Sequence, residues 1–208
     1  HRDLHLSLRR QRQMCIRDSF KYALLASTLI FASCSDDDDN TPDPVNEEEV
    51  ITTLTVTLDS GSDTVVMQYQ DLDGDGPDAA TVTVSGSLNA NTVYDGSIVL
   101  LNETESPAEN VTEEIEEEDD EHQFFYTVGS GLDVATEYAN FDGDGNPLGT
   151  LFVLNVGSAS SGGLTFTLRH EPNKPNTGLE NAGGSTDIEV TFDVTAVSYT
   201  HLTLPTKA

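Results

Sequence analysis

Carboxylates recur at alternate positions in one short glycine-containing stretch, a spacing that suits the binding of a hard cation. The stretch reads "DLDGDG" and holds Asp71, Asp73 and Asp75, with Asp78 close behind. Calcium takes about six to eight oxygen ligands, and glycine allows a loop to curl around the ion. We therefore expect Asp71, Asp73, Asp75 and Asp78 to form a first Ca²⁺ site.

A second stretch, "NFDGDG", repeats this pattern with Asn140, Asp142 and Asp144. Amide and carboxylate oxygens are both calcium ligands, so we expect a second Ca²⁺ site here. The alternative for both stretches is a structural role, because Asp-Gly pairs also make tight turns between strands. Either role places the two stretches in loops.

Both stretches resemble the D-x-[DN]-x-[DN]-G start of the EF-hand calcium loop. An EF-hand also needs a glutamate at the twelfth loop position. That position holds Val82 in the first stretch and Leu151 in the second, and the flanking residues have strand character. The stretches are therefore more similar to the looser calcium loops of extracellular β proteins, with dissociation constants of about 0.1–1 mM.

When the two ends of the chain are set aside, two histidines remain, His122 and His170. Each of them is next to a glutamate in the sequence. Imidazole nitrogen suits zinc, copper, iron and nickel, so the pair would form a transition-metal site if the fold brought them together. Their separation in sequence does not require this. The alternative, which we expect, is two surface histidines at strand ends.

Arg169 and Lys174 lie in a proline-containing stretch, "RHEPNKPNTG", of an otherwise acidic chain. The chain has 9 Lys and Arg against 37 Asp and Glu, and its formal net charge is −28. The two basic side chains could receive an anionic ligand or, as we expect, pair with the protein's own carboxylates. A net charge of this sign repels nucleic acid, so no nucleic-acid partner is expected.

Common catalytic signatures do not occur in the sequence, which contains no G-x-S-x-G, no H-E-x-x-H and no Walker loop. Two carboxylates could still catalyse glycoside hydrolysis, so a surface hydrolase of the glycosidase type is an alternative. Such enzymes usually grip sugars with aromatic side chains, and the chain has no Trp, although Tyr69, Tyr94 and Tyr138 are available. We expect a protein that is not an enzyme.

Apolar and polar residues alternate with a period of two through most of residues 50–196, which indicates β-strands. Val, Thr, Phe and Tyr are frequent in these segments, and clusters of Gly, Asn and Asp separate them. The expected strands are 50–59, 63–70, 80–88, 92–103, 122–129, 133–141, 149–157, 163–171 and 186–196. This pattern predicts an all-β domain, an antiparallel, immunoglobulin-like β-sandwich of about 7–9 strands.

One short acidic helix is expected on the surface of this sandwich. Ser106, Pro107 and Glu109 have the types and spacing of an N-cap, a first helical residue and the third residue of a capping box. The run of acidic residues at 117–121 opposes the helix dipole and should end the helix. Val111 and Ile115 lie four residues apart and should dock the helix on the sandwich.

An apolar run near the N-terminus predicts an export signal. Lys21 precedes the run at residues 22–31, which is too short to span a bilayer. The run is followed by "ASC", and Cys34 with the small residues before it resembles a bacterial lipoprotein box. The resemblance implies that residues 20–33 are a signal peptide and that the Cys34 thiol carries a diacylglycerol. The alternative is an ordinary secretory signal with an incidental cysteine.

Residues 34–49 are expected to form a disordered acidic tether, because "SDDDDNTPDPVNEEE" cannot bury an apolar face. Its like charges repel one another and extend it. Residues 35–39, "SDDDD", resemble the acidic export signal of Bacteroidota surface lipoproteins. This resemblance implies a protein held to the outer membrane by the lipid on Cys34 and facing the cell exterior, with the periplasmic face as the alternative.

One short DNA sequence, read on opposite strands, can encode a segment near each end of the chain. Residues 14–18, "MCIRD", can be written ATG TGT ATA AGA GAC, whose reverse complement encodes residues 197–201, "VSYTH". We therefore interpret residues 1–19 and 197–208 as translated sequencing-adaptor sequence. A single domain of ordinary size is then expected at residues 50–196.

Together these features predict a non-catalytic lipoprotein of the cell surface. Its β-sandwich would be a binding or structural module, with weakly bound calcium as a stabilising cofactor. The alternative is an accessory lipoprotein of an outer-membrane nutrient uptake system, which would bind a solute or a glycan.

Overall fold

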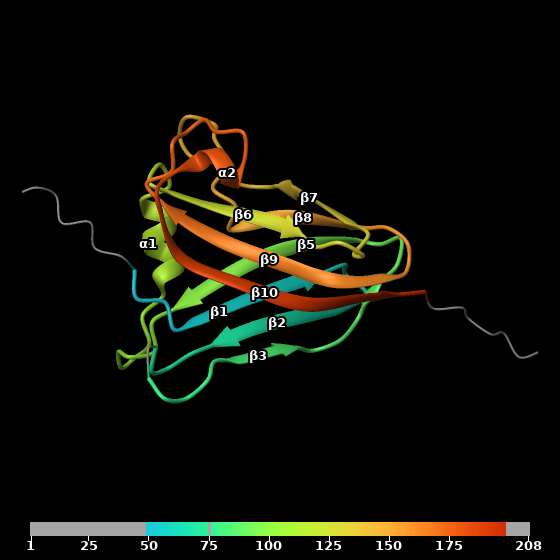
Figure 1. Cartoon of the computed structure of the whole chain (residues 1–208). Helices are drawn as coiled ribbons and strands as arrows, with labels where there is room; N and C mark the ends of the chain where they lie inside the picture. The colour runs from blue at the N-terminus through green and yellow to red at the C-terminus, as the bar shows by residue number, and fades with distance from the viewer. Residues whose placement is uncertain (1–48, 75, 199–208) are drawn as a thin grey trace, which may run out of the picture. The chain divides into compact units, whose positions relative to one another are not determined.

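The chain forms two β-sheets in the part that the computed structural model describes, residues 49–74 and 76–198. The strands are β1 (Thr53–Asp59), β2 (Thr64–Gln70), β3 (Thr81–Val84), β4 (Leu88–Asn89), β5 (Val93–Leu101), β6 (His122–Val128), β7 (Val134–Tyr138), β8 (Leu151–Val156), β9 (Ser160–His170) and β10 (Ser185–Val197). The helices are α1 (Val111–Glu117) and α2 (Leu179–Ala182). Figure 1 shows the two sheets with the short helices α1 and α2 at one end. The predicted all-β sandwich is confirmed.

Several predicted features lie outside the described residues. These are the signal peptide at 20–33, the lipidated Cys34, the tether up to residue 48, and Asp75 of the first acidic stretch. Residues 1–19 and 199–208 of the two flanking segments also lie outside them.

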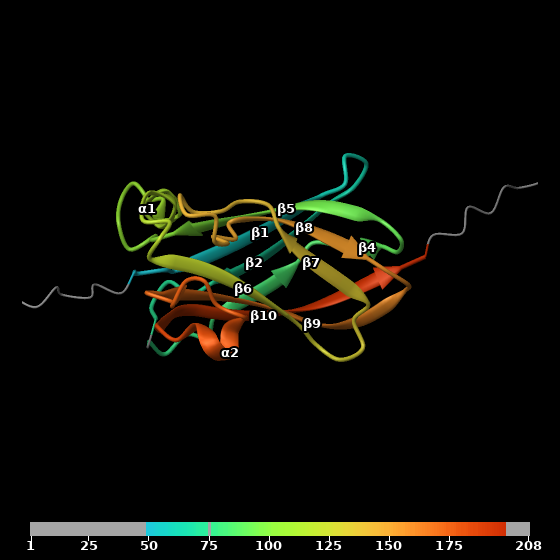
Figure 2. The same cartoon turned by 90° about the horizontal axis from the view of Figure 1, so that it is seen from above.

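The two sheets form the layers of the sandwich. The six-stranded sheet has the order β3-β2-β1-β5-β8-β7, and the four-stranded sheet has the order β4-β10-β9-β6. Figure 2 shows β1 and β5 on one side and β9 and β10 on the other. Neighbouring strands are antiparallel except β4 and β10, which pair in parallel. The chain changes sheet repeatedly, so residues far apart in sequence become neighbours.

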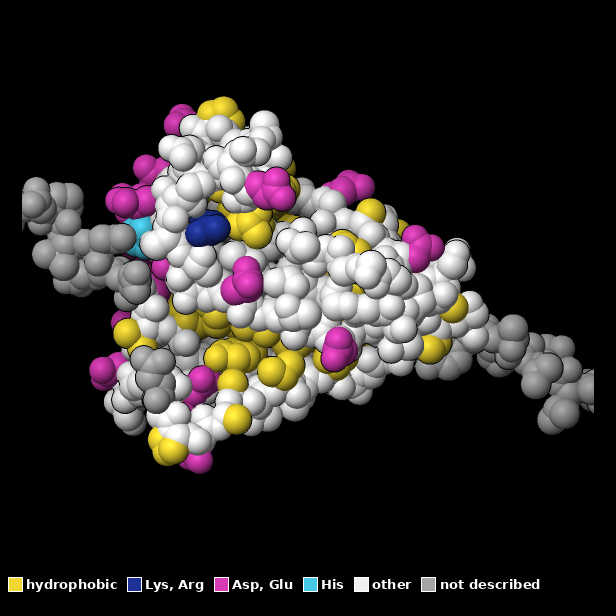
Figure 3. All heavy atoms as spheres, viewed as in Figure 1, with side chains coloured by type: hydrophobic (Ala, Val, Ile, Leu, Met, Phe, Trp, Pro, Cys, Tyr) yellow, Lys and Arg dark blue, Asp and Glu magenta, His cyan; other side chains and the backbone are white. Residues whose placement is uncertain are grey.

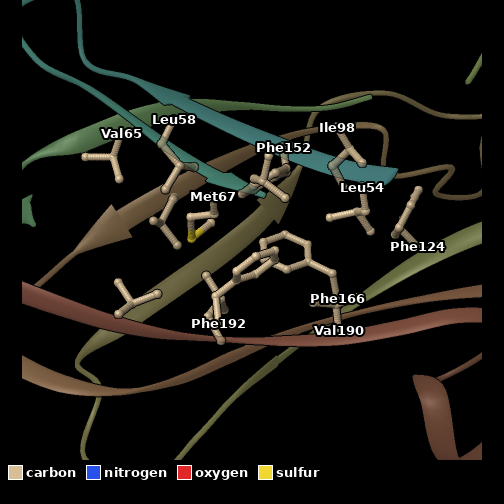
Figure 4. Packing of buried hydrophobic residues seen from close by; sticks show 14 of the residues in the cluster. Leu54, Leu58, Val65, Met67, Ile98, Phe124, Phe152, Phe166, Val190 and Phe192 are labelled. Atoms are coloured by element: carbon tan, nitrogen blue, oxygen red, sulfur yellow. The ribbon is translucent and has the colours of Figure 1, made fainter. Parts of the chain in front are cut away.

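The core is built from the inward-facing alternate residues of both sheets. Phe166 of β9 joins the layers, because its ring centroid lies 5.7 Å from that of Phe152 on β8 and 6.0 Å from that of Phe192 on β10. Figure 4 shows these rings among aliphatic side chains from the surrounding strands. Such aromatic pairs each contribute about 0.5–1.5 kcal/mol beyond the burial of their area. Gly96 of β5 pairs with Phe152, and the phenyl ring fills the space that a Cβ would need.

The predicted strands are all present, with the third divided into β3 and β4. β3 pairs with β2 in the six-stranded sheet, whereas β4 pairs with β10 in the other sheet, so the chain changes layer between them. The last strand runs to Val197, whose carbonyl oxygen accepts a hydrogen bond from the Ala90 amide at 2.8 Å. The predicted domain boundary at residue 196 therefore lies inside β10.

The predicted start of the acidic helix is wrong. Helix α1 begins at Val111, and its N-cap Asn110 makes no capping hydrogen bond with its side chain. The reason is a pair of backbone hydrogen bonds between Asn102 and Glu109, which hold Glu109 in an antiparallel bridge and so outside the helix. The predicted docking is confirmed, because Val111 and Ile115 are both buried in the core.

No helix among residues 49–74 and 76–198 has the length and apolar character needed to cross a bilayer.

Candidate metal centre

The first acidic stretch forms a turn whose carboxylates bind their own backbone. Asp71 accepts a hydrogen bond through Oδ1 from the Gly74 amide at 2.9 Å and one through Oδ2 from the Tyr69 hydroxyl at 3.3 Å. Asp73 accepts one through Oδ2 from the Asp78 amide at 3.2 Å. Among the described residues, Asp71, Asp73 and Asp78 are not part of any group of three potential ligands that converge on one point.

A shallow hollow of about 330 Å³ lies beside this turn. Its lining includes Tyr69, Asp71 and residues 50–52. Of the other tyrosines that were candidates for ligand contacts, Tyr94 is fully buried and donates a hydrogen bond to Asp63 at 2.9 Å. The hydroxyl of Tyr138 donates to the Phe124 carbonyl at 2.8 Å. Of the three, Tyr69 lines the hollow beside the first acidic turn.

The second acidic stretch is neutralised by a lysine. Asp142 is buried, and its Oδ1 accepts hydrogen bonds from the Asp144 amide at 3.0 Å and the Asn146 amide at 2.8 Å. Its Oδ2 lies 3.2 Å from Nζ of Lys174, which also donates to the Asp119 carbonyl at 2.5 Å. The expectation that Lys174 pairs with the protein's own carboxylates is therefore confirmed. A cation at Asp142 would compete with this ammonium.

Asn140 of the second stretch has a structural role in its loop. The side-chain oxygen of Asn140 accepts hydrogen bonds from the amides of Gly149 and Leu151, both at 3.0 Å. Asn140 therefore holds the loop between β7 and β8, whereas Asp142 is paired with Lys174 and Asp144 is exposed to solvent.

The two histidines meet at the end of the four-stranded sheet. His122 begins β6 and His170 ends β9, and the register of these strands places the two residues opposite each other. Their ring centroids are 4.8 Å apart and their ring planes are inclined by 72°. His122 has no exposed surface and His170 has 5 %. The expectation that they are surface residues is therefore wrong.

Both histidines continue the apolar rows that face the core. In β9 the inward row runs through Phe166 and Leu168 to His170, and in β6 it runs from His122 to Phe124. The alternation that buries these apolar side chains also directs the two imidazoles inward. Figure 1 shows that β6 begins and β9 ends beside α1, so this site lies at the end of the sandwich that the helix occupies.

Asp187 joins the pair because β10 contains a bulge. The pairing of β10 with β9 shifts between Thr186 and Ile188, which leaves Asp187 as an extra residue. In a regular strand, neighbouring side chains point to opposite faces of the sheet, but a bulge changes this direction. The side chains of Asp187 and of its neighbour Ile188 are therefore both buried. Its Oδ1 lies 4.0 Å from Nδ1 of His170. Ligand atoms of His122, His170 and Asp187 all lie within 4.8 Å of one another.

The end of α1 orients the ring of His122. Nδ1 of His122 lies 3.2 Å from the carbonyl oxygen of Glu118, the C-cap residue of the helix. A carbonyl oxygen can only accept, so Nδ1 carries the proton and Nε2 has the lone pair. Nε2 is buried and has no hydrogen-bond partner among the described residues. Burial lowers the pKa of His122, and His170 lowers it further, which favours the neutral ring.

Carboxylates surround the histidines. Glu49 and Glu118 each place an oxygen within 4.8 Å of a ring nitrogen of His122 and of each other, and Glu121 and Glu171 form a similar group with His170. Burial raises the pKa of Glu49 to about 7, and repulsion from Glu114, Glu118 and Asp187 adds to the effect. Figure 3 shows histidine and acidic side chains together at this end of the molecule. The site therefore places several carboxylates around the two imidazoles.

The sequence pointed to His122 and His170 but gave no reason to include Asp187, Glu49 or Glu118. A usable signal was present for the histidines, because each stands in the inward phase of its strand pattern. No comparable signal marks Asp187, because strict alternation from Ile188 would turn it outward.

The comparisons with family models, curated proteins and solved structures found no match for this chain.

Proposed function

We propose that this protein is a non-catalytic lipoprotein of the cell surface and that its β-sandwich is a binding or structural module. The observation that carries the proposal is the junction at Cys34, where an apolar run meets a small-residue pair, one cysteine and a row of aspartates. The lipid chains on Cys34 would supply an anchor of about 0.8 kcal/mol per buried CH₂. The outer membrane, reached through that lipid, is the partner that the proposal names.

The sandwich supports a role in binding or structure. Its core is continuous between the two sheets, and the hollow beside the first acidic turn is shallow. Figure 3 shows apolar side chains exposed along the groove between β10 and β2. Contiguous exposed apolar surface is typical of contact sites for other molecules.

Fractionation and mass spectrometry of the full chain in a host with a lipoprotein export pathway test the anchor. The wild-type protein should be in the membrane fraction, with its N-terminal peptide carrying a diacylglycerol at Cys34. The Cys34→Ala variant should be released in soluble form. An unmodified Cys34 in the membrane-bound protein would contradict the proposal.

Protease treatment of intact cells tests the face of the membrane. An outward-facing protein should be cleaved in intact cells, and replacing residues 36–39 by alanine should protect it until the cells are lysed. Protection of the wild-type protein in intact cells would place it on the periplasmic face instead. A periplasmic protein of known location is the control for cell integrity.

A second candidate is an accessory ligand-binding lipoprotein of a nutrient uptake system. The hollow beside Tyr69 favours it, because an aromatic ring next to the Asp71 carboxylate could hold a sugar or another polar solute. Binding should be lost in Tyr69→Ala and retained in Tyr69→Phe, which keeps the ring. A glycan and solute screen in which both variants match the wild type would exclude this hollow as the site.

A further inference from the structure

We propose that His122, His170 and Asp187 form a binding site for a divalent first-row transition metal of the zinc type. This inference goes beyond the proposed surface role and does not depend on it. The residues come from three different strands, β6, β9 and β10, and their ligand atoms already lie within 4.8 Å of one another.

To bind one ion, the three ligand atoms would have to approach one another by up to about 1.5 Å. In a tetrahedral zinc site the metal–ligand bonds are about 2.0–2.2 Å long, so neighbouring ligand atoms are about 3.3 Å apart. The Oδ1 of Asp187 and Nδ1 of His170 are 4.0 Å apart. Side-chain rotations that move these two atoms closer by less than about 1 Å would allow both of them to bind the same ion.

The orientation of His122 is the second independent observation. Its Nδ1–H is directed to the Glu118 carbonyl, which fixes the tautomer and presents the Nε2 lone pair. Metal-binding histidines almost always donate their other N–H to a carbonyl or carboxylate in this way. The Nε2 atom is fully buried and makes no hydrogen bond to any described residue, an arrangement that is rare in the absence of a ligand.

The surrounding charge favours a cation. Glu49 and Glu118 lie on the side of His122, and Glu121 and Glu171 lie on the side of His170. A divalent ion would relieve the repulsion among these carboxylates. The ammonium of Lys174 is engaged elsewhere, with Asp142 and the Asp119 carbonyl.

The donor set selects the class of metal. Two imidazole nitrogens and a carboxylate suit zinc, cobalt, nickel, copper and iron, whereas calcium and magnesium prefer oxygen ligands throughout. The site therefore differs in chemistry from the two acidic turns. Its position between three strand ends and the end of α1 would let a bound ion hold these elements together.

Titration of the chelator-treated full chain with Zn²⁺ tests the proposal. We expect one tight site per chain, unaffected by millimolar Ca²⁺, and a rise in the melting temperature. Substitution with Co²⁺ should give the intense visible absorption of a tetrahedral site. His122→Gln, His170→Gln and Asp187→Asn should each weaken Zn²⁺ binding at least about tenfold.

A matched control replaces an exposed carboxylate outside this cluster. Asp144→Asn should leave the tight site unchanged. Equal Zn²⁺ affinity in wild type and all three site variants would overturn the proposal, as would the absence of a stoichiometric site. If a site variant does not fold, NMR of the wild-type imidazoles decides the question. Zn²⁺ should then shift the signals of both His122 and His170, and unchanged signals would overturn the proposal.

Discussion

Lys174 and Asp142 form a buried ion pair across two loops, with 3.2 Å between Nζ and Oδ2. The side chains retain only 6 % and 2 % of their exposure. The lysine comes from the loop after β9 and the aspartate from the loop between β7 and β8, so the pair links the two sheets. A protein ammonium thus neutralises the buried carboxylate of the second acidic turn.

Removing this lysine should destabilise the fold. Lys174→Met leaves the buried Asp142 carboxylate without its counter-ion, and we expect the free energy of unfolding to fall by about 3 kcal/mol. Urea unfolding of the wild type, Lys174→Met, Asp142→Asn and the double variant would measure the coupling between the two side chains. A loss below about 0.5 kcal/mol would indicate that the pair behaves like an exposed surface ion pair.

The same pair predicts an acid-sensitive contribution to stability. Burial by itself would raise the pKa of Asp142, but hydrogen bonds from Asn146 and the Lys174 ammonium outweigh it, and the pKa is lowered. A carboxylate of this kind stabilises the fold above its unfolded pKa of about 3.9 and loses that contribution as the pH falls through the lower folded value. The stability difference between wild type and Asp142→Asn should therefore be constant above about pH 5 and shrink below about pH 4. A difference that stays constant at lower pH would contradict this.

Calcium should bind and stabilise the protein at the first acidic turn rather than at the second. At a concentration ten times the dissociation constant, calcium would add about 1.4 kcal/mol of stability. For a domain of this size that corresponds to a rise in melting temperature of about 3–6 °C. The rise should disappear in Asp73→Asn and persist in Asp142→Asn, because Lys174 already neutralises the second turn. Identical melting in EDTA and in several millimolar calcium would exclude calcium as a stabilising cofactor.

Gly96 should tolerate no side chain. A Cβ at this position would overlap the ring of Phe152, so Gly96→Ala should destabilise the protein by about 1–3 kcal/mol through overpacking. Gly86→Ala is the matched control, because no atom lies within 4 Å of a Cβ built there. Thermal or urea unfolding would compare the two variants. Equal stability of both would show that the core near Phe152 can rearrange.

The strands could be predicted because their signal is local. In β1, β9 and β10 every second side chain packs in the core, so the period-two pattern marks the strand without knowledge of its partner. The start of helix α1 was predicted wrongly, because Ser106, Pro107 and Glu109 form a good capping sequence when only the local sequence is considered. The bridge between Glu109 and Asn102, which overrides that local preference, is a contact with the end of β5.

The acidic turns illustrate the same limit. Their sequence predicts sharp loops, and the hydrogen bonds of Asp71, Asp73 and Asp142 to nearby amides form such loops. The sequence did not indicate which of the two turns would meet Lys174. That choice depends on how the loop after β9 folds against the loop after β7.

The sequence by itself determined the strand-rich fold and the acidic, turn-forming character of the two loops, but it led to the wrong expectation of surface histidines. Only the tertiary structure decided that the histidines meet each other and Asp187. Their meeting depends on the register of β6 against β9 and on one extra residue in β10. Register and bulges are set by packing between distant segments, and a shift of a single residue would turn these side chains to the opposite face of the sheet.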